Sequence, residues 1–344
     1  MLPAAYGDAL IVEYGRPNDL HRILIDGGPA YSYAEGLGAA LTRLPENQRE
    51  FELLVVSHID ADHIEGGIMV MRHGLARFKD IWFNGWKHLE PERGAVQGEM
   101  LDALIPPALW NVAFRGQAVA IPDTGDLPVV ELDGGARLTL LSPGREQLRR
   151  LRKAWTTELA KRELTPGDAE AALQLLDERT ELLPPTRGGP KVLGGDAAPA
   201  NGSSIAFLLE VGPRAVLLGA DAHAPVLAGA LRRLAEARGT SAIRLDAFKL
   251  PHHGSASNVS EELFQRIDCS RFLVSTNGAK FKHPDKEAIE LIGRAFGSTT
   301  ARPQVVFNYR SSTTNRWLDP GAQAEANIVA RFPPETSSSM VVEL

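Results

Sequence analysis

Short apolar runs separated by turns that contain glycine or proline occupy both ends of the chain. The runs at 8–14, 22–26 and 53–56 have the length and β-branched content of strands, and the loop at 15–19 predicts a hairpin between the first two. Further strands are predicted at 79–83, 136–141, 204–211, 214–219, 243–249, 271–275 and 303–308. Helices are predicted at about 33–43, from about residue 64, and at 225–238, 259–267 and 284–296.

This regular pattern is lost from about 87 to 200. Two stretches there, near 145–163 and 167–182, are rich in Leu, Arg, Glu and Ala with helical spacing, whereas 184–200 has the Pro, Gly and Ala content of a loop. We therefore predict one α/β domain over 1–344, a two-sheet sandwich with helices outside and a partly helical insertion at about 87–200. The order of elements alone would also fit a doubly wound α/β fold.

Composition narrows the class of protein. Of the 344 residues, 44% are hydrophobic and 23% charged, as in an ordinary globular protein. No run approaches the ~18 apolar residues of a membrane span, and residues 1–8 do not resemble a signal peptide, so we expect no membrane partner. A single cysteine, Cys269, excludes an internal disulfide and a Cys-rich zinc site and fits a cytoplasmic location. The net charge of −6 argues against broad coating of nucleic acid, but not against a nuclease.

The strongest chemical signal follows the strand at 53–56. Four potential metal ligands, His58, Asp60, Asp62 and His63, lie directly after that strand. Ligands of α/β proteins bind at the carboxyl ends of strands, and alternate residues of an extended segment face the same side. A helix cap explains one aspartate but not two aspartates with two histidines, so the motif predicts a metal site.

Two other strand ends carry candidate ligands. Asp221 follows the apolar run 216–220 and can bridge two metals, although by itself it would be read as a cap for the next helix. His252 and His253 follow the strand that ends at 250, on a tight turn where neutral imidazoles make good contacts to metal or phosphate.

A third strand end carries positive charge. Lys280, Lys282 and His283 follow the strand at 271–275. The two lysines can hold a phosphate, and His283 can donate a proton to a leaving oxygen. Capping of the following helix is an equally good explanation of His283 alone.

Together these residues resemble the HxHxDH motif of the metallo-β-lactamase superfamily, with Asp60 at the position of the second histidine. That variant looks like the branch that contains the soluble domain of DNA-uptake competence proteins (ComEC-like), here as a stand-alone form without the membrane part. The resemblance extends over Gly7-Asp8-Ala9, residues 24–29, 201–204, Asp221, residues 252–255 and His283-Pro284. It implies an αββα sandwich with a dinuclear metal site.

The resemblance also implies roles for individual residues. Asp26 orients the metal loop without binding metal, and one of His252 and His253 is the last ligand. We prefer His253 for that role, with His252 facing the substrate, and the choice between them stays open. A further ligand histidine of the superfamily is matched here by Asn201 or Ser203.

We assign one metal to His58, Asp60 and Asp221, and the other to Asp62, His63, His253 and Asp221. Two metals roughly 4 Å apart would activate water and stabilise both the attacking and the leaving oxygen of a phosphoryl displacement. The catalytic residues would be Asp62, His252 and His283. Because oxygen ligands replace two imidazoles, Mn²⁺ or Mg²⁺ is favoured over Zn²⁺.

The resulting hypothesis is a metal-dependent hydrolase of phosphodiester bonds, with DNA as the favoured substrate. One alternative is a hydrolase of small phosphodiesters, lactones or other esters, which the net charge of −6 favours. A second is a metal-binding module with reduced catalysis that docks a regulatory protein through residues 145–182. The oligomeric state has no signature in the sequence.

Overall fold

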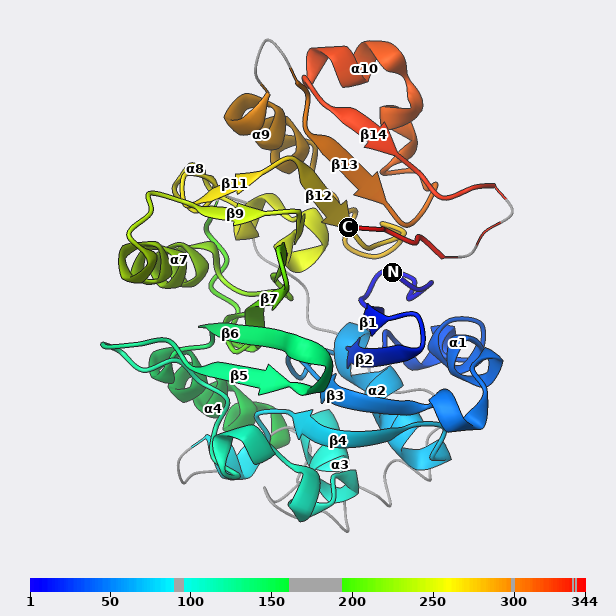
Figure 1. Cartoon of the computed structure of the whole chain (residues 1–344), viewed down its shortest axis with the longest axis vertical. Coiled ribbons are helices and arrows are strands. Elements are labelled where there is room, and N and C mark those ends of the chain that lie inside the picture. The colour runs from blue at the N-terminus through cyan, green and yellow to red at the C-terminus, as the bar shows by residue number, and fades with distance from the viewer. Residues whose placement is uncertain (90–95, 161–193, 298–300, 336, 338) are drawn as a thin grey trace.

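The computed structural model describes residues 1–89, 96–160, 194–297, 301–335, 337 and 339–344 (Figure 1). The helix predicted at 167–182 and the loop residues 184–193 lie outside this part. No helix within it is long and apolar enough to cross a membrane.

The first sheet is formed by the N-terminal strands in the order β1-β2-β3-β4. β1 and β2 form the predicted antiparallel hairpin, and β2, β3 and β4 are parallel. The strands are β1 (Leu10–Arg16), β2 (Asp19–Ile25), β3 (Glu50–Val55) and β4 (Arg77–Trp82).

The second sheet is larger and has the order β14-β13-β12-β10-β8-β7-β6-β5 among the described residues. Its middle strands β8, β10, β12 and β13 are parallel, so their carboxyl ends lie at one edge. The strands are β5 (Val129–Leu132), β6 (Ala136–Ser142), β7 (Ala206–Val211), β8 (Arg214–Leu218), β10 (Ala247–Lys249), β12 (Arg271–Val274), β13 (Gln304–Phe307) and β14 (Val329–Arg331). A separate pair joins β9 (Ile243–Leu245) and β11 (Ile267–Cys269).

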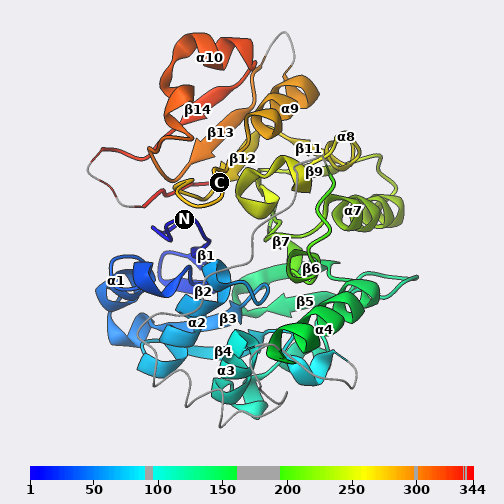
Figure 2. The ribbon, with the colours of Figure 1, turned by 180° about the vertical axis from the view of Figure 1, so that it is seen from behind.

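Helices flank these sheets. They are α1 (Leu37–Arg43), α2 (Ala61–His73), α3 (Val96–Leu104), α4 (Arg145–Ala160), α6 (Pro199–Gly202), α7 (Ala224–Arg238), α8 (Glu261–Phe264), α9 (Lys286–Phe296) and α10 (Pro320–Glu325). Seen from behind, α2, α3 and α4 lie over the first sheet (Figure 2). On the far side, α7 and α9 pack with the second sheet.

The side chains of β3, which point alternately to its two faces, show how the layers are held together. Leu53 and Val55 point into the core shared with the second sheet. Leu54 and Val56 point to the opposite face and pack with α2, α3 and α4. Since successive residues of a strand face opposite sides, a strand that is apolar throughout must be covered on both faces. The predicted αββα sandwich is thereby confirmed.

Local boundaries differ from the predictions at four places. α2 begins at Ala61 rather than near residue 64, so the last two residues of the metal motif lie in its first turn. The single strand predicted at 243–249 is two strands, because Asp246 leaves the run to accept a hydrogen bond from the backbone of Ala215 (2.9 Å). The helix predicted at 259–267 ends at Phe264, and β11 follows. Within 87–200, β6 confirms the strand predicted at 136–141, whereas β5 was not predicted.

Candidate metal centre

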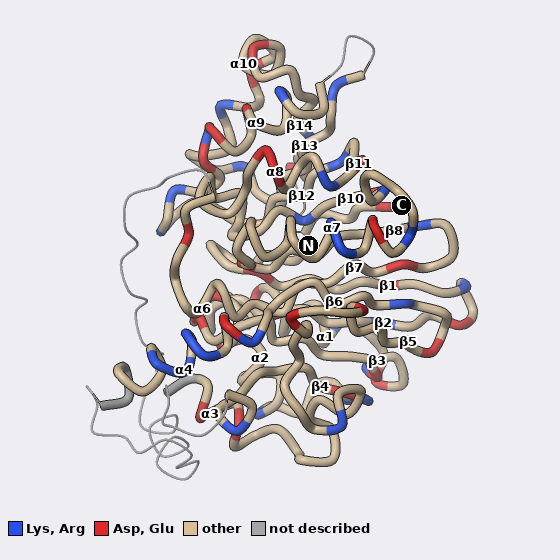
Figure 3. Tube along the Cα trace, turned by 90° about the vertical axis from the view of Figure 1, so that its left-hand side faces the viewer, with Lys and Arg blue, Asp and Glu red and all other residues tan. Residues whose placement is uncertain are grey.

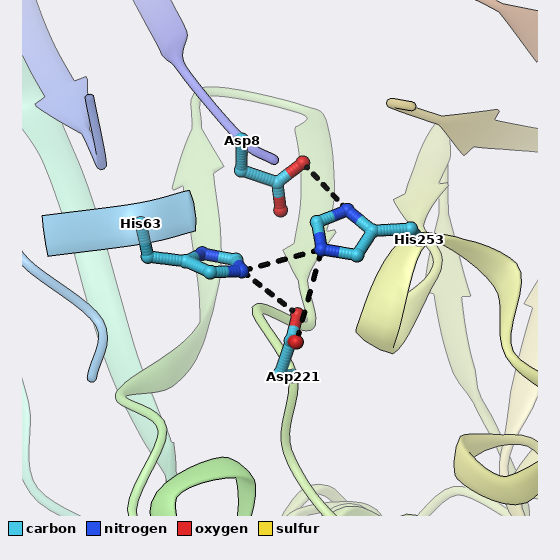
Figure 4. A group of neighbouring side chains, drawn as sticks. All are labelled: Asp8, His63, Asp221 and His253. Carbon is cyan, nitrogen blue, oxygen red and sulfur yellow. Dashed lines mark hydrogen bonds and ion pairs between the residues drawn. The ribbon is translucent and has the colours of Figure 1, made fainter. Parts of the chain in front are cut away.

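Four imidazoles surround the carboxylate of Asp221. The Nε2 atoms of His58, His63, His252 and His253 lie 3.9, 3.4, 3.7 and 3.8 Å from its oxygens. These residues come from four separate segments, at the ends of β3, β8 and β10 and in the first turn of α2. Figure 4 shows how His63 and His253 approach Asp221 from opposite sides.

The outer nitrogen of each ring, Nδ1, points away from Asp221 and contacts another group. A carboxylate oxygen of Asp26 lies 2.8 Å from Nδ1 of His63, and the amide oxygen of Asn258 lies 2.8 Å from Nδ1 of His252. The carbonyl oxygen of Ser275 lies 2.9 Å from Nδ1 of His253. A carbonyl oxygen can only accept, so Nδ1 of His253 carries a proton, and Nε2 of the neutral ring directs its lone pair at Asp221. Burial alone would lower the pKa of His253, but the charges of Asp221 and Asp8 raise it to about 9, so this position favours a cation.

Two further carboxylates flank Asp221. Asp62 Oδ2 lies 3.4 Å from Nε2 of His253 and 3.9 Å from Nε2 of His63. Asp60 Oδ2 lies 3.6 Å from Nε2 of His58. Asp60 thus contacts His58, whereas Asp62 contacts His63 and His253.

Unsatisfied atoms show that the site fits metal ions. Among the described residues, Nε2 of His58 and Oδ1 of Asp221 are buried without a hydrogen-bond partner. Buried polar atoms are nearly always satisfied, so such atoms in a nitrogen and oxygen donor set fit the binding of a cation. Burial alone would raise the pKa of Asp221, but the charges of His63, His252 and His253 lower it well below its usual range. Asp221 is therefore ionised and available as a bridging ligand.

The backbone at the site has unusual conformations. His252, His253 and Asp26 have φ values of 48°, 56° and 57°, in the left-handed region that non-glycine residues rarely adopt. Ala220, directly before Asp221, has a φ of 43°. Such conformations cost about 1–3 kcal/mol each and persist where surrounding structure imposes them, commonly at functional sites.

Asp26 and its neighbours fix the loop that follows β3. Its carboxylate accepts hydrogen bonds from the backbone N–H and the hydroxyl of Ser57, at 2.7 and 2.8 Å, besides contacting His63. Asp26 therefore contacts His63 rather than Asp221. Directly after Asp26, Gly27 touches Gly66 of α2 so closely that a Cβ on Gly66 would lie 2.0 Å from the Gly27 carbonyl oxygen. These glycines allow α2 to approach the turn and bring His63 inward.

A buried ion pair lies behind His253. Asp8 pairs with Lys249, and both side chains are almost completely buried. Asp8 also lies 3.4 Å from His253 Nδ1, close enough that Asp8, His63, Asp221 and His253 could surround one ion (Figure 4). However, Asp8 faces the outer nitrogen of His253, whereas His63 and Asp221 face the inner one, and Lys249 already compensates its charge. We therefore assign Asp8 to the orientation of His253.

Sequence reasoning gave no role to Asp8, Lys249 or Asp196. Two signals were present: Asp8 lies in a segment of the family resemblance, and Lys249 interrupts an apolar strand. Asp196 had no comparable signal, because it lies within the stretch 184–200 whose composition predicts a loop. It lies 3.6 Å from Nδ1 of His252.

Asn201 and Ser203 do not face Asp221. The amide of Asn201 donates to Asp196 (2.7 Å) and lies 3.2 Å from Nδ1 of His252. The hydroxyl of Ser203 donates to the carbonyl of Ala200 at 2.6 Å. Asn201 thus supports the back of the His252 ring, and Ser203 closes the turn of α6.

The residues after β12 lie at the border of the centre. The His283 ring stands edge-on to His252, with centroids 5.0 Å apart. Lys280 lies over the ring of Tyr6 at 4.9 Å, and its charge interacts with that of Asp62. Lys282 instead turns back and donates to the carbonyl of Ala279 at 3.1 Å.

No family model and no curated protein matches this sequence. Solved structures that are distantly similar include the following two. One, a mutant of the CmlA beta-hydroxylase, is 14% identical with a TM-score of 0.39 over 97% of this chain and 52% of its own. The other, CmlA, a diiron beta-hydroxylase from Streptomyces venezuelae, is 14% identical with a TM-score of 0.35 over 94% and 53%. This chain spans about half the length of each, and a likeness this weak carries no argument about activity.

Proposed function

We propose that this protein is a hydrolase of the metallo-β-lactamase superfamily, in its ComEC-like branch, which cleaves phosphodiester bonds of DNA with two divalent metal ions. The observation that carries the proposal is the convergence of imidazoles on Asp221 from both sides, flanked by Asp60 and Asp62. An isolated metal-binding loop would not require ligands from four segments with their outer nitrogens individually held.

His58, Asp60 and Asp221 would hold one ion, and Asp62, His63, His253 and Asp221 the other. When bound, such a pair of ions activates water and stabilises the charge that develops on phosphate oxygens. Mn²⁺ or Mg²⁺ is the proposed metal, because carboxylate oxygens supply much of the donor set.

The remaining residues would act on the substrate. Lys280 would neutralise a phosphate oxygen near Asp62, and the aromatic ring of Tyr6 beneath it restricts its position. His283 would donate a proton to the leaving oxygen, since it borders His252 and is largely buried. Asp62, which is ionised in spite of burial because of His253 and His63, would help to orient the attacking water.

The DNA backbone would lie along α4. This helix carries a run of basic residues near its start: Arg145, Arg149, Arg150, Arg152 and Lys153. Figure 3 shows the basic segments of α4 beside α6, on which α4 packs. Arg150 interacts electrostatically with His223, which lies 3.9 Å from Asp196 beside His252. A local basic helix that leads to the centre can bind phosphates although the whole chain is acidic.

The proposal is tested on purified, chelated protein that is reloaded with Mn²⁺, Mg²⁺ or Zn²⁺. We expect bound metal by elemental analysis and cleavage of labelled single- or double-stranded DNA. His63→Ala should lose both, whereas His73→Ala, which removes an exposed histidine from the other end of α2, should lose neither. Cleavage of a chromogenic diester without any cleavage of DNA would overturn the DNA assignment. Absence of stoichiometric metal would overturn the proposal as a whole.

A further inference from the structure

We infer that His252 is a metal ligand rather than a group that faces only the substrate. The inference rests on the proposed dinuclear site and changes its composition. His252 would join His58, Asp60 and Asp221 at the first position. Both positions would then have the same donor set, namely two imidazoles, one terminal carboxylate and the shared carboxylate of Asp221.

The position of the ring carries the inference. His252 Nε2 lies 3.7 Å from Asp221 Oδ2, and His58 Nε2 lies 3.9 Å from the same oxygen. The distance for His252 is no longer than that of His253, which lies 3.8 Å from Oδ2. The two neighbouring histidines therefore approach the bridging carboxylate equally closely, and geometry gives no reason to choose one of them.

The backbone explains how two consecutive side chains can reach one carboxylate. In an extended strand they would point to opposite faces. Here His252 and His253 are both left-handed, and Gly254 follows with a φ of 83°. The N–H of His252 donates to the carbonyl of Ala220 at 2.8 Å, which ties the turn to the residue before Asp221. Binding of metal by both rings would explain why this strained turn is retained.

The surroundings of His252 fix its tautomer. Asn258 Oδ1 lies 2.8 Å from Nδ1, and the amide nitrogen of Asn258 donates to Asp196 and to the carbonyls of Asp221 and Ala222. Those three partners only accept, so the orientation of the Asn258 amide is determined and its oxygen must accept from His252 Nδ1. In the neutral ring, Nε2 of His252 then directs its lone pair at Asp221.

Asp196 completes an arrangement typical of metal-bound histidines. Its Oδ2 lies 3.6 Å from Nδ1 of His252 and accepts from both Asn201 and Asn258. A carboxylate behind the outer nitrogen orients a ligand imidazole and increases its basicity. Behind His63, Asp26 lies closer, with Oδ2 2.8 Å from Nδ1.

The exposure of the rings is consistent with a position open to substrate. The side chain of His252 is 21% exposed, whereas those of His58, His63 and His253 are completely buried. An ion held partly by His252 would lie on the accessible side of the centre, where the leaving group and His283 could reach it.

The test measures metal binding rather than turnover. Mn²⁺ stoichiometry and affinity are determined by titration calorimetry, and by electron paramagnetic resonance at increasing ratios of metal to protein. We expect the wild type to bind two ions, and His252→Ala to retain the ion of the His63 position while losing the other. Asp196→Asn should weaken the same ion by about 10–100-fold. His283→Ala, which removes the ring next to His252, should bind both ions normally.

His252→Asn serves as a second variant, because asparagine tolerates the left-handed backbone and preserves the turn. Circular dichroism confirms that each variant is folded. Two ions bound with wild-type affinity by both His252 variants would overturn the inference and return His252 to the substrate side. That result would leave the proposed hydrolase intact, whereas a wild-type protein without metal would remove the proposed function itself.

Discussion

Replacement of Lys249 by methionine tests whether the buried pair behind His253 organises the centre. The side chains of Lys249 and Asp8 are 1% and 2% exposed and form an ion pair. Burial would raise the pKa of Asp8, but the charges of Lys249 and His253 hold it below its usual range. Lys249→Met keeps the length of the side chain but leaves Asp8 as a buried charge with reduced compensation.

Breaking a buried pair on one side costs about 3–5 kcal/mol. At an unfolding entropy of about 2.1 cal/mol/K per residue, a chain of 344 residues changes by about 0.7 kcal/mol per degree, so Tm should fall by ~4–7 °C. Asp8→Asn should also lower Tm, because it leaves Lys249 buried without a carboxylate. The double variant removes both charges, so its Tm should fall by much less than the sum of the two single losses.

Thermal unfolding is followed by circular dichroism in the presence of chelator, so that metal binding does not contribute to Tm. Leu41→Ala in α1, whose side chain is buried in the other apolar core, serves as a control for general loss of packing and should be additive with Lys249→Met. Strict additivity of Asp8→Asn and Lys249→Met, or a shift below about 1 °C for either variant, would refute the reasoning.

Four further predictions follow from the same structure. Asp62→Ala and His63→Ala should each abolish turnover while the far-ultraviolet circular dichroism is preserved, and near-normal turnover of either would contradict the ligand assignment. Mn²⁺ should support more activity than Zn²⁺ in chelated enzyme, which full rescue by stoichiometric Zn²⁺ would refute. His283→Ala should slow DNA cleavage by roughly 10²–10⁴-fold but affect a nitrophenyl diester far less, because nitrophenolate leaves without a proton; equal losses would exclude proton donation. Burial and the charge of Lys87 lower the pKa of His88 to about 4. As pH falls, the unfolded chain binds a proton at this histidine before the folded protein does. The free energy of unfolding should therefore fall between pH 6.5 and 4, by about 2 kcal/mol at pH 5. His88→Gln should show a smaller loss of stability between pH 7 and 5.

The order of elements and most candidate ligands were predictable because they depend on local features. The hairpin of β1 and β2, the buried β3 and the helices α7 and α9 follow from apolar runs and turn residues. His58, Asp60, Asp62 and His63 lie so close together in the sequence that their convergence depends only on strand geometry. The sequence could not predict that β5 and β6 join the second sheet, because sheet membership depends on long-range pairing.

By itself, the sequence determined which residue types are available at the ends of the strands and which segments are apolar enough to be buried. Tertiary structure decided where His252 points, because the left-handed turn and the contacts of Asn258 and Asp196 direct its ring towards Asp221. It also decided the pairing of Asp8 with Lys249, residues 241 positions apart. The physical reason is the same in both cases: the direction of a side chain and the partner of a buried charge depend on segments brought together only when the two sheets pack.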